Sequence, residues 1–181
     1  MFVIISGPSG VGKNTVIEEL LKRNDNLRYL MSCSTRKPRE HEIGKGYIYL
    51  DFDEMQKKLE NNELFEHEEI HGNTYGTLNS SVEEIIKGEK DFIKDLGVLG
   101  QKYYVSRLKD KVKIVSIYLT CPKDEVEKRL VERGEKEVEK RLERFDFEES
   151  HKGNFDYVIE NVDLGETVEF IESKIYPKGN L

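Results

Sequence analysis

The chain has 181 residues, of which 36% are hydrophobic and 36% are charged, and its formal net charge at pH 7 is −7. This length suits one domain with a core of its own, and the acidic balance argues against broad binding to nucleic acid or to an acidic membrane. Cys33 and Cys121 lack metal-ligand spacing, and no segment is long enough for a signal peptide or membrane span. We therefore expect a cytoplasmic protein with reduced thiols.

The first element is a short apolar run at residues 2–5, which predicts a strand buried on both faces. A glycine-rich segment, Gly7–Lys13 (GPSGVGK), follows it, and residues 16–21 continue with helical spacing. A strand, a glycine-rich turn and a helix in this order are typical of a phosphate-binding loop. In such a loop backbone N–H groups surround phosphate oxygens and the helix N-terminus adds partial positive charge. The alternative is a glycine-rich turn that only joins a strand to a helix.

This loop predicts a set of nucleotide contacts. Lys13 is expected to reach the outer phosphates as a point charge. Asn14 stands where a Ser or Thr usually follows the lysine, so Thr15 is the expected hydroxyl for Mg²⁺ or its water shell. The expected nucleotide contacts in the loop are Gly7, Ser9, Gly10, Val11, Gly12, Lys13, Asn14 and Thr15.

A second strand is predicted at residues 27–31, and a basic segment follows it at residues 32–39 (SCSTRKPR). The alternative for such a segment is a solvated basic turn. Arg36 and Arg39 nevertheless offer planar guanidinium groups suited to a second phosphate, separate from the one at Lys13.

The remaining elements alternate between strands and helices. A turn is expected at residues 72–77, and His67 and His71, which flank two glutamates, are expected to be solvated rather than metal ligands. Strands are expected at 47–50, 63–70, 91–96, 112–119 and 155–159, and helices after Asp51, from Ser80 or Ser81 to Gly88, after Gly100, at 123–133 and around 168–175. This order predicts an α/β fold with a parallel sheet covered by helices on both faces.

Several ordered motifs give the chain its resemblance to a known family. They are GPSGVGK at Gly7–Lys13, STRKPR at Ser34–Arg39, GNTYGT at Gly72–Thr77, KRLVERG at Lys128–Gly134 and DYVIEN at Asp156–Asn161. On these residues, from about Ile4 to Leu164, the chain resembles the guanylate kinases of the nucleoside monophosphate kinase group. The resemblance implies a P-loop kinase core at 1–31 and 91–181, a GMP-binding insertion at 32–90 and a mobile lid at about 131–142, within a single domain at 1–181.

The resemblance also implies an activity and a set of site residues. The activity is Mg²⁺-assisted phosphoryl transfer from ATP to GMP, and to dGMP. Positions matching those that hold the GMP phosphate are Arg36, Arg39, Tyr47 and Tyr75, and those matching the guanine site are Ser32, Glu66 and Thr77. Asp95 matches a family aspartate and is also expected among the GMP-binding residues. Arg129, Arg133 and Arg141 match catalytic arginines that act with Lys13, and Asn161 is expected near adenine.

The chemistry of guanine supports Glu66 independently. Guanine presents adjacent N1–H and N2–H₂ donors that a carboxylate can accept together, whereas adenine has an acceptor at N1. A hydroxyl of Ser32 or Thr77 can donate to O6. The alternative is that Glu66 is one more surface glutamate of an acidic run, and the charged segment 129–144 is likewise expected to be an exposed helix with ion pairs between its lysines and glutamates.

Two departures from the family pattern keep other functions open. Gly97 stands where the family has a second aspartate, and the lid is about three residues shorter than usual. The alternatives are a kinase for another nucleoside monophosphate or a ribose bisphosphate, and a guanylate-kinase-like binding module that recognises phosphopeptides without turnover. The sequence leaves open whether the protein is a monomer or a homodimer.

Overall fold

The computed structural model describes residues 1–38, 46–70 and 72–176. Its central feature is a sheet of five parallel strands in the order β2-β7-β1-β8-β9. These strands are β1 (Phe2–Ser6), β2 (Leu27–Tyr29), β7 (Asp91–Asp95), β8 (Ile114–Thr120) and β9 (Tyr157–Glu160). The predicted α/β fold with a parallel sheet is therefore confirmed, and β1 lies in the middle of that sheet because it is apolar on both faces.

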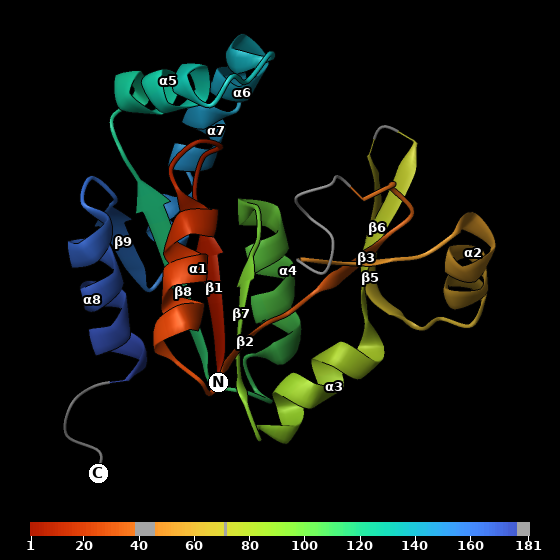
Figure 1. The fold of residues 1–181 in the computed structure, drawn as a ribbon. Coiled ribbons are helices and arrows are strands. Elements are labelled where there is room, and N and C mark those ends of the chain that lie inside the picture. Colours follow the sequence, from red (N-terminus) through yellow and green to blue (C-terminus); the bar gives the residue numbers. More distant parts are fainter. Residues whose placement is uncertain (39–45, 71, 177–181) are drawn as a thin grey trace.

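Helices cover both faces of this sheet (Figure 1). Val3 and Ile5 of β1 pack in one core cluster with α1 (Lys13–Arg23) and α8 (Leu164–Ile175). Phe2 and Ile4 point the opposite way, into a second cluster with α3 (Asn79–Lys87) and α4 (Val98–Leu108). The alternation of a strand's side chains thus divides the core into two layers, one on each side of the sheet.

A second sheet extends to one side of the core (Figure 1). Its strand order is β4-β3-β6-β5, formed by β3 (Ser32–Ser34), β4 (Tyr47–Tyr49), β5 (Leu64–Ile70) and β6 (Asn73–Leu78). Helix α2 (Phe52–Glu60) connects β4 to β5, and it begins after Asp51 as expected from the sequence. The Asp51 side chain caps this helix and forms a capping box with Glu54.

Two segments of this second sheet differ from the sequence expectation. Residues 32–34, at the start of the basic segment, form β3, a strand that was not expected, and most of the expected turn at 72–77 forms β6. Strand β6 pairs antiparallel with both β3 and β5, for example Gly76 with Cys33 and with His67. These pairings join segments far apart in the sequence, so a local pattern of glycine and hydroxyl residues does not reveal them.

Short helices lie at the carboxyl end of the parallel sheet, above the loop that follows β1 (Figure 1). They are α5 (Lys123–Glu132), α6 (Val138–Glu143), α7 (Phe145–Glu149) and a 3₁₀ turn, η2 (Lys152–Asn154). In parallel α/β sheets this end is where ligands bind. Within the described part of the chain, no helix has the length and apolar character needed to cross a membrane.

Candidate functional site

The loop between β1 and α1 has a backbone that requires glycine. Gly7, Gly10 and Gly12 have positive φ values of 140°, 91° and 101°, which side chains rarely tolerate. A Cβ atom on Gly7 would lie 2.1 Å from the carbonyl oxygen of Leu119, and one on Gly12 would lie 2.7 Å from Nδ2 of Asn161. The loop therefore keeps a tight path against β8 and against the residue that follows β9.

Asn161 and Arg129 hold this loop in place through hydrogen bonds. The buried side-chain amide of Asn161 donates to the carbonyl of Val11 at 2.7 Å. The guanidinium of Arg129 donates to the carbonyl of Asn161 at 3.1 Å and pairs with Glu125 at 3.0 Å. Both residues also line the cleft described below. Their hydrogen bonds thus position the loop, in addition to the nucleotide contacts expected from the sequence.

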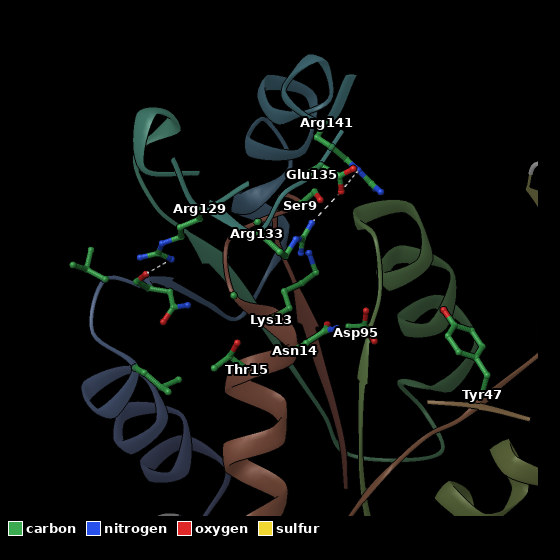
Figure 2. A pocket seen from close by; sticks show the side chains of 15 residues that line it. Ser9, Lys13, Asn14, Thr15, Tyr47, Asp95, Arg129, Arg133, Glu135 and Arg141 are labelled. Atoms are coloured by element: carbon green, nitrogen blue, oxygen red, sulfur yellow. Dashed lines mark hydrogen bonds and ion pairs between the residues drawn. The ribbon is translucent and has the colours of Figure 1, made fainter. Parts of the chain in front are cut away.

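Lys13, the first residue of α1, points into the space above the loop (Figure 2). Its Nζ donates to the carbonyls of Gly7 at 2.6 Å and Pro8 at 3.0 Å. Burial lowers the pKa of Lys13, while the charges of Asp95 and Glu148 act in the opposite direction. The ammonium is therefore held where an anionic ligand of the loop would meet it.

A cleft of about 870 Å³ joins the glycine-rich loop to residues from both ends of the chain (Figure 2). It extends from the loop to Asp95 of β7 and to Tyr47 of the second sheet. Its lining consists of Ser9, Gly10, Gly12, Lys13, Asn14, Thr15, Tyr47, Asp95, Arg129, Arg133, Glu135, Arg141, Asn161, Val162 and Leu164. The structure thus brings most of the predicted ATP-side residues, though not Gly7 or Val11, into one space with Tyr47 and Asp95 of the predicted GMP side.

Glu135 holds two arginines at the rim of this cleft (Figure 2). Its Oε2 lies 3.2 Å from a guanidinium nitrogen of Arg133 and 3.5 Å from Nε of Arg141. A hydrogen bond from the backbone of Glu137 lowers the pKa of Glu135, and the two arginine charges lower it further. Glu135 was expected among the glutamates of an exposed helix with ion pairs to lysines, so its contact with two arginines was not predicted. Its position in the sequence between Arg133 and Arg141 was the available signal.

The predicted phosphate-binding residues of the second sheet gather around Tyr47. The guanidinium of Arg36 lies 5.5 Å from the ring centre of Tyr47 and 5.9 Å from that of Tyr49. The rings of Tyr47 and Tyr75 meet edge to face at 5.9 Å. Arg39 lies outside the described residues. Arg36, Tyr47 and Tyr75 therefore form one cationic and phenolic group beside the cleft.

The predicted guanine-reading residues also come together, between the second sheet and α4. Thr77 donates its hydroxyl to Oε1 of Glu66 at 2.7 Å, and Tyr104 donates to the same oxygen at 3.2 Å. Nearby, Ser32 accepts a hydrogen bond of 2.6 Å from Nζ of Lys94. These contacts show that Glu66 is engaged in a hydrogen-bond network, unlike the solvated surface glutamate considered as the alternative.

Three residues of this region escaped the sequence analysis. Tyr104 is fully buried on α4, and Tyr29 donates its hydroxyl to Asp95. Lys94 lies in the middle of the buried strand β7 and is 3% exposed. For Lys94 there was a signal, since a lysine within an apolar strand must find partners for its charge. Tyr29 and Tyr104 carried no comparable signal, because buried tyrosines are common in cores.

The cleft contains oxygen groups of the kind that Mg²⁺ prefers. The hydroxyl of Thr15 and the carboxylate of Asp95 both line it, next to the loop expected to hold phosphates. Among the described residues, no three His, Cys, Asp or Glu side chains gather into a metal site. The donor set therefore fits an ion shared with substrate phosphates, which needs few protein ligands.

Comparisons with known proteins agree on one family. The family described as "Guanylate kinase" matches residues 1–177 of this chain. The chain is similar to a guanylate kinase of Thermotoga maritima, with 38% identity over 175 residues that cover 94% of this chain and 83% of that protein. It is also similar to a guanylate kinase of Porphyromonas gingivalis, with 39% identity over 184 residues that cover 96% of this chain and 95% of that protein.

One solved structure supports the same family, and a second shares the fold. A crystal structure of guanylate kinase from Anaplasma phagocytophilum superimposes with a TM-score of 0.72 and 28% identity, covering 97% of this chain and 84% of that one. A shikimate kinase structure from Bacteroides thetaiotaomicron matches with a TM-score of 0.51 and 11% identity, covering 97% of this chain and 98% of that one. The second likeness concerns the fold alone.

Proposed function

This chain belongs to the guanylate kinase family, and from this premise we propose that it transfers the γ-phosphoryl group of ATP to GMP, giving ADP and GDP. The observation that carries the proposal is the single cleft that runs from Lys13 and the glycine-rich loop to Tyr47 of the second sheet. Phosphoryl transfer needs a donor and an acceptor aligned across such a gap, with cations on the transferring group. The intact Lys13 loop favours turnover over a binding module without catalysis.

The ATP phosphates are assigned to the loop at residues 7–15. Its backbone N–H groups and the start of α1 bind them, and Lys13 moves its ammonium from the carbonyls of Gly7 and Pro8 to the outer phosphates. Adenine is assigned to the part of the cleft beside Asn161, where Val162 and Leu164 supply apolar surface. Arg129 supports this arrangement from α5, since it lines the cleft and holds the backbone at Asn161.

The lid is assigned to residues 131–142, which carry Arg133 and Arg141. Both arginines are exposed and share Glu135, so a competing phosphate can draw them inward at small cost. In the closed state they would stabilise charge on the transferring group and exclude water, which competes as phosphoryl acceptor.

GMP is assigned to the insertion at residues 32–90. Arg36, Tyr47 and Tyr75 hold its phosphate, and Arg39 is expected to join them. Oε2 of Glu66 faces the N1–H and N2–H₂ donors of guanine, since Oε1 already accepts from Thr77 and Tyr104. Ser32 is assigned to O6, and Asp95 to the GMP side of the cleft, near Lys13 and Thr15.

Mg²⁺ is the expected cofactor, and Thr15 and Asp95 are the residues that would hold it or its water shell. When bound, it neutralises phosphate charge. We further propose that the protein is a cytoplasmic enzyme that binds no nucleic acid. Its oligomeric state stays a prediction, namely a monomer or a homodimer.

One assay tests the proposed function. Purified protein is supplied with ATP, Mg²⁺ and, in turn, GMP, dGMP, AMP, CMP, UMP and ribose 1,5-bisphosphate, and ADP release is coupled to NADH oxidation. We expect GMP and dGMP to be turned over well above the other acceptors, and Lys13→Ala to abolish this turnover. Preference for another acceptor, or GMP turnover unaffected by Lys13→Ala, would reject the proposal.

A further inference from the structure

Lys94 is a buried lysine with an uncommon set of partners. It is 3% exposed, and its Nζ donates to Oγ of Ser32 at 2.6 Å and to the carbonyl of Leu30 at 3.2 Å. It forms no salt bridge with any described residue. Burial lowers the pKa of Lys94, and the nearby charges of Glu66 and Asp95 oppose that effect. A buried ammonium is costly, so its retention here calls for a use.

The hydrogen bond from Lys94 fixes the role of the Ser32 hydroxyl. Nζ of Lys94 is the donor in this hydrogen bond, so Oγ of Ser32 acts as the acceptor. The hydroxyl hydrogen of Ser32 is then left for a different acceptor, and no described residue accepts it. The Ser32 hydroxyl is thus a hydrogen-bond donor toward neighbouring groups, and the hydrogen bond from Lys94 restricts the direction in which it can donate.

Glu66 has the complementary arrangement. Thr77 and Tyr104 both donate to its Oε1, and Oε2 has no donor among the described residues. Of these two groups, Lys94 contacts Ser32, through the hydrogen bond from its Nζ. The region therefore offers one donor, the Ser32 hydroxyl, and one acceptor without a donor among the described residues, Oε2 of Glu66. Guanine presents the matching edge, with an acceptor at O6 and donors at N1 and N2, whereas adenine presents an amine at the O6 position.

We propose that Lys94 is a positioning residue that selects 6-oxopurines by holding the Ser32 hydroxyl as a hydrogen-bond donor toward the base. The inference rests on the proposed function, because it concerns the acceptor nucleotide of that reaction. Lys94 acts only through Ser32. Without it, the Ser32 hydroxyl can rotate and donate to other acceptors, so it no longer favours an oxygen over an amine at purine position 6.

The test separates O6 recognition from recognition by Glu66. We compare kcat/KM for GMP, 6-thio-GMP and IMP, since sulfur is a weak acceptor at position 6 and IMP lacks only the N2 amine. The variants are Lys94→Met, which keeps length without donors, Lys94→Gln, which keeps an N–H donor, and Ser32→Ala. Lys90→Met, at an exposed lysine just before the same strand, is the matched control. Thermal unfolding shows that each variant folds.

In the wild-type protein we expect GMP to exceed 6-thio-GMP by roughly tenfold. Lys94→Met should reduce that ratio toward the value of Ser32→Ala, with Lys94→Gln between, while the GMP-to-IMP ratio and the KM for ATP stay unchanged. An unchanged GMP-to-6-thio-GMP ratio in Lys94→Met, or an equal fall in both ratios, would overturn the inference. Absence of GMP turnover in the wild-type protein would instead refute the proposed function.

Discussion

The side-chain amide of Asn161 donates a hydrogen bond of 2.7 Å to the carbonyl of Val11, a residue 150 positions earlier in the chain. This contact ties the end of β9 to the glycine-rich loop, and it also places Nδ2 where a side chain on Gly12 would lie. The loop path therefore depends on a residue from the far end of the sequence.

Replacing Asn161 should weaken both the fold and the nucleotide site. Asn161→Ala removes this donor and leaves the Val11 carbonyl with only the longer hydrogen bond of 3.3 Å from Arg129, so we expect a loss of about 0.5–1.5 kcal/mol in the free energy of unfolding. The KM for ATP should rise more than the KM for GMP. Denaturant titration and steady-state kinetics measure the two effects. The control is Asn26→Ala at an exposed position, and equal effects from both variants would contradict the bracing role.

Replacing a glycine of the loop by alanine should lower the melting temperature much more than the same replacement at Gly97. A Cβ on Gly7 would overlap the Leu119 carbonyl at 2.1 Å, and its φ is +140°. We therefore expect Gly7→Ala to lower the melting temperature strongly or to prevent folding. Gly97 has nothing within 4 Å of its Cβ position and a φ of −65°, so Gly97→Ala should leave the melting temperature almost unchanged. Similar melting temperatures for the two variants would show that the loop path is wrong.

The open oxygen of Glu66 predicts a selectivity change. Glu66→Gln replaces one acceptor oxygen with an amide donor, so we expect kcat/KM for GMP to fall roughly 10- to 100-fold. The value for AMP should fall much less. Glu69→Gln, at an exposed position on the same strand, is the control. If the Glu66→Gln enzyme kept the wild-type preference for GMP over AMP, the assignment of Glu66 to guanine recognition would be wrong.

Glu148 predicts a pH dependence of stability. Burial raises the pKa of this carboxyl, although the charges of Lys13 and Arg144 lower it in part. The folded protein therefore holds the carboxyl proton of Glu148 more tightly than the unfolded chain does. As the pH rises above 4.5, the ordinary pKa of a glutamate, the contribution of this proton to the free energy of unfolding falls. Glu148→Gln lacks this contribution.

Urea titrations at pH 4.5 and pH 7 measure the effect. The difference in unfolding free energy, Glu148→Gln minus wild type, should become more positive toward pH 7. A difference that stays constant, or that becomes more negative, would contradict the raised pKa.

The parts of the fold that depend on neighbouring residues could be predicted from the sequence. The strand at 2–5, the loop to Lys13 and the cap at Asp51 each follow from a local pattern, and the structure has all three. Strand β6 was expected as a turn. Its strand conformation depends on pairing with β3 and β5, which a local sequence pattern does not show.

The candidate site shows the same division. The residues of the phosphate loop lie in one motif, whereas the acceptor side combines Ser32, Glu66, Lys94 and Tyr104 from four elements. Lys94 and Ser32 are separated by 62 positions, so only the folded chain shows that one donates to the other.

The most direct test of the central claim follows the transferred group itself. ATP labelled with ³²P at the γ-position is incubated with the protein, Mg²⁺ and unlabelled GMP, and the nucleotides are separated by chromatography. Our account predicts that the label appears in GDP, at a rate that depends on Lys13. Label that remains in ATP, or that appears only as inorganic phosphate, would contradict it.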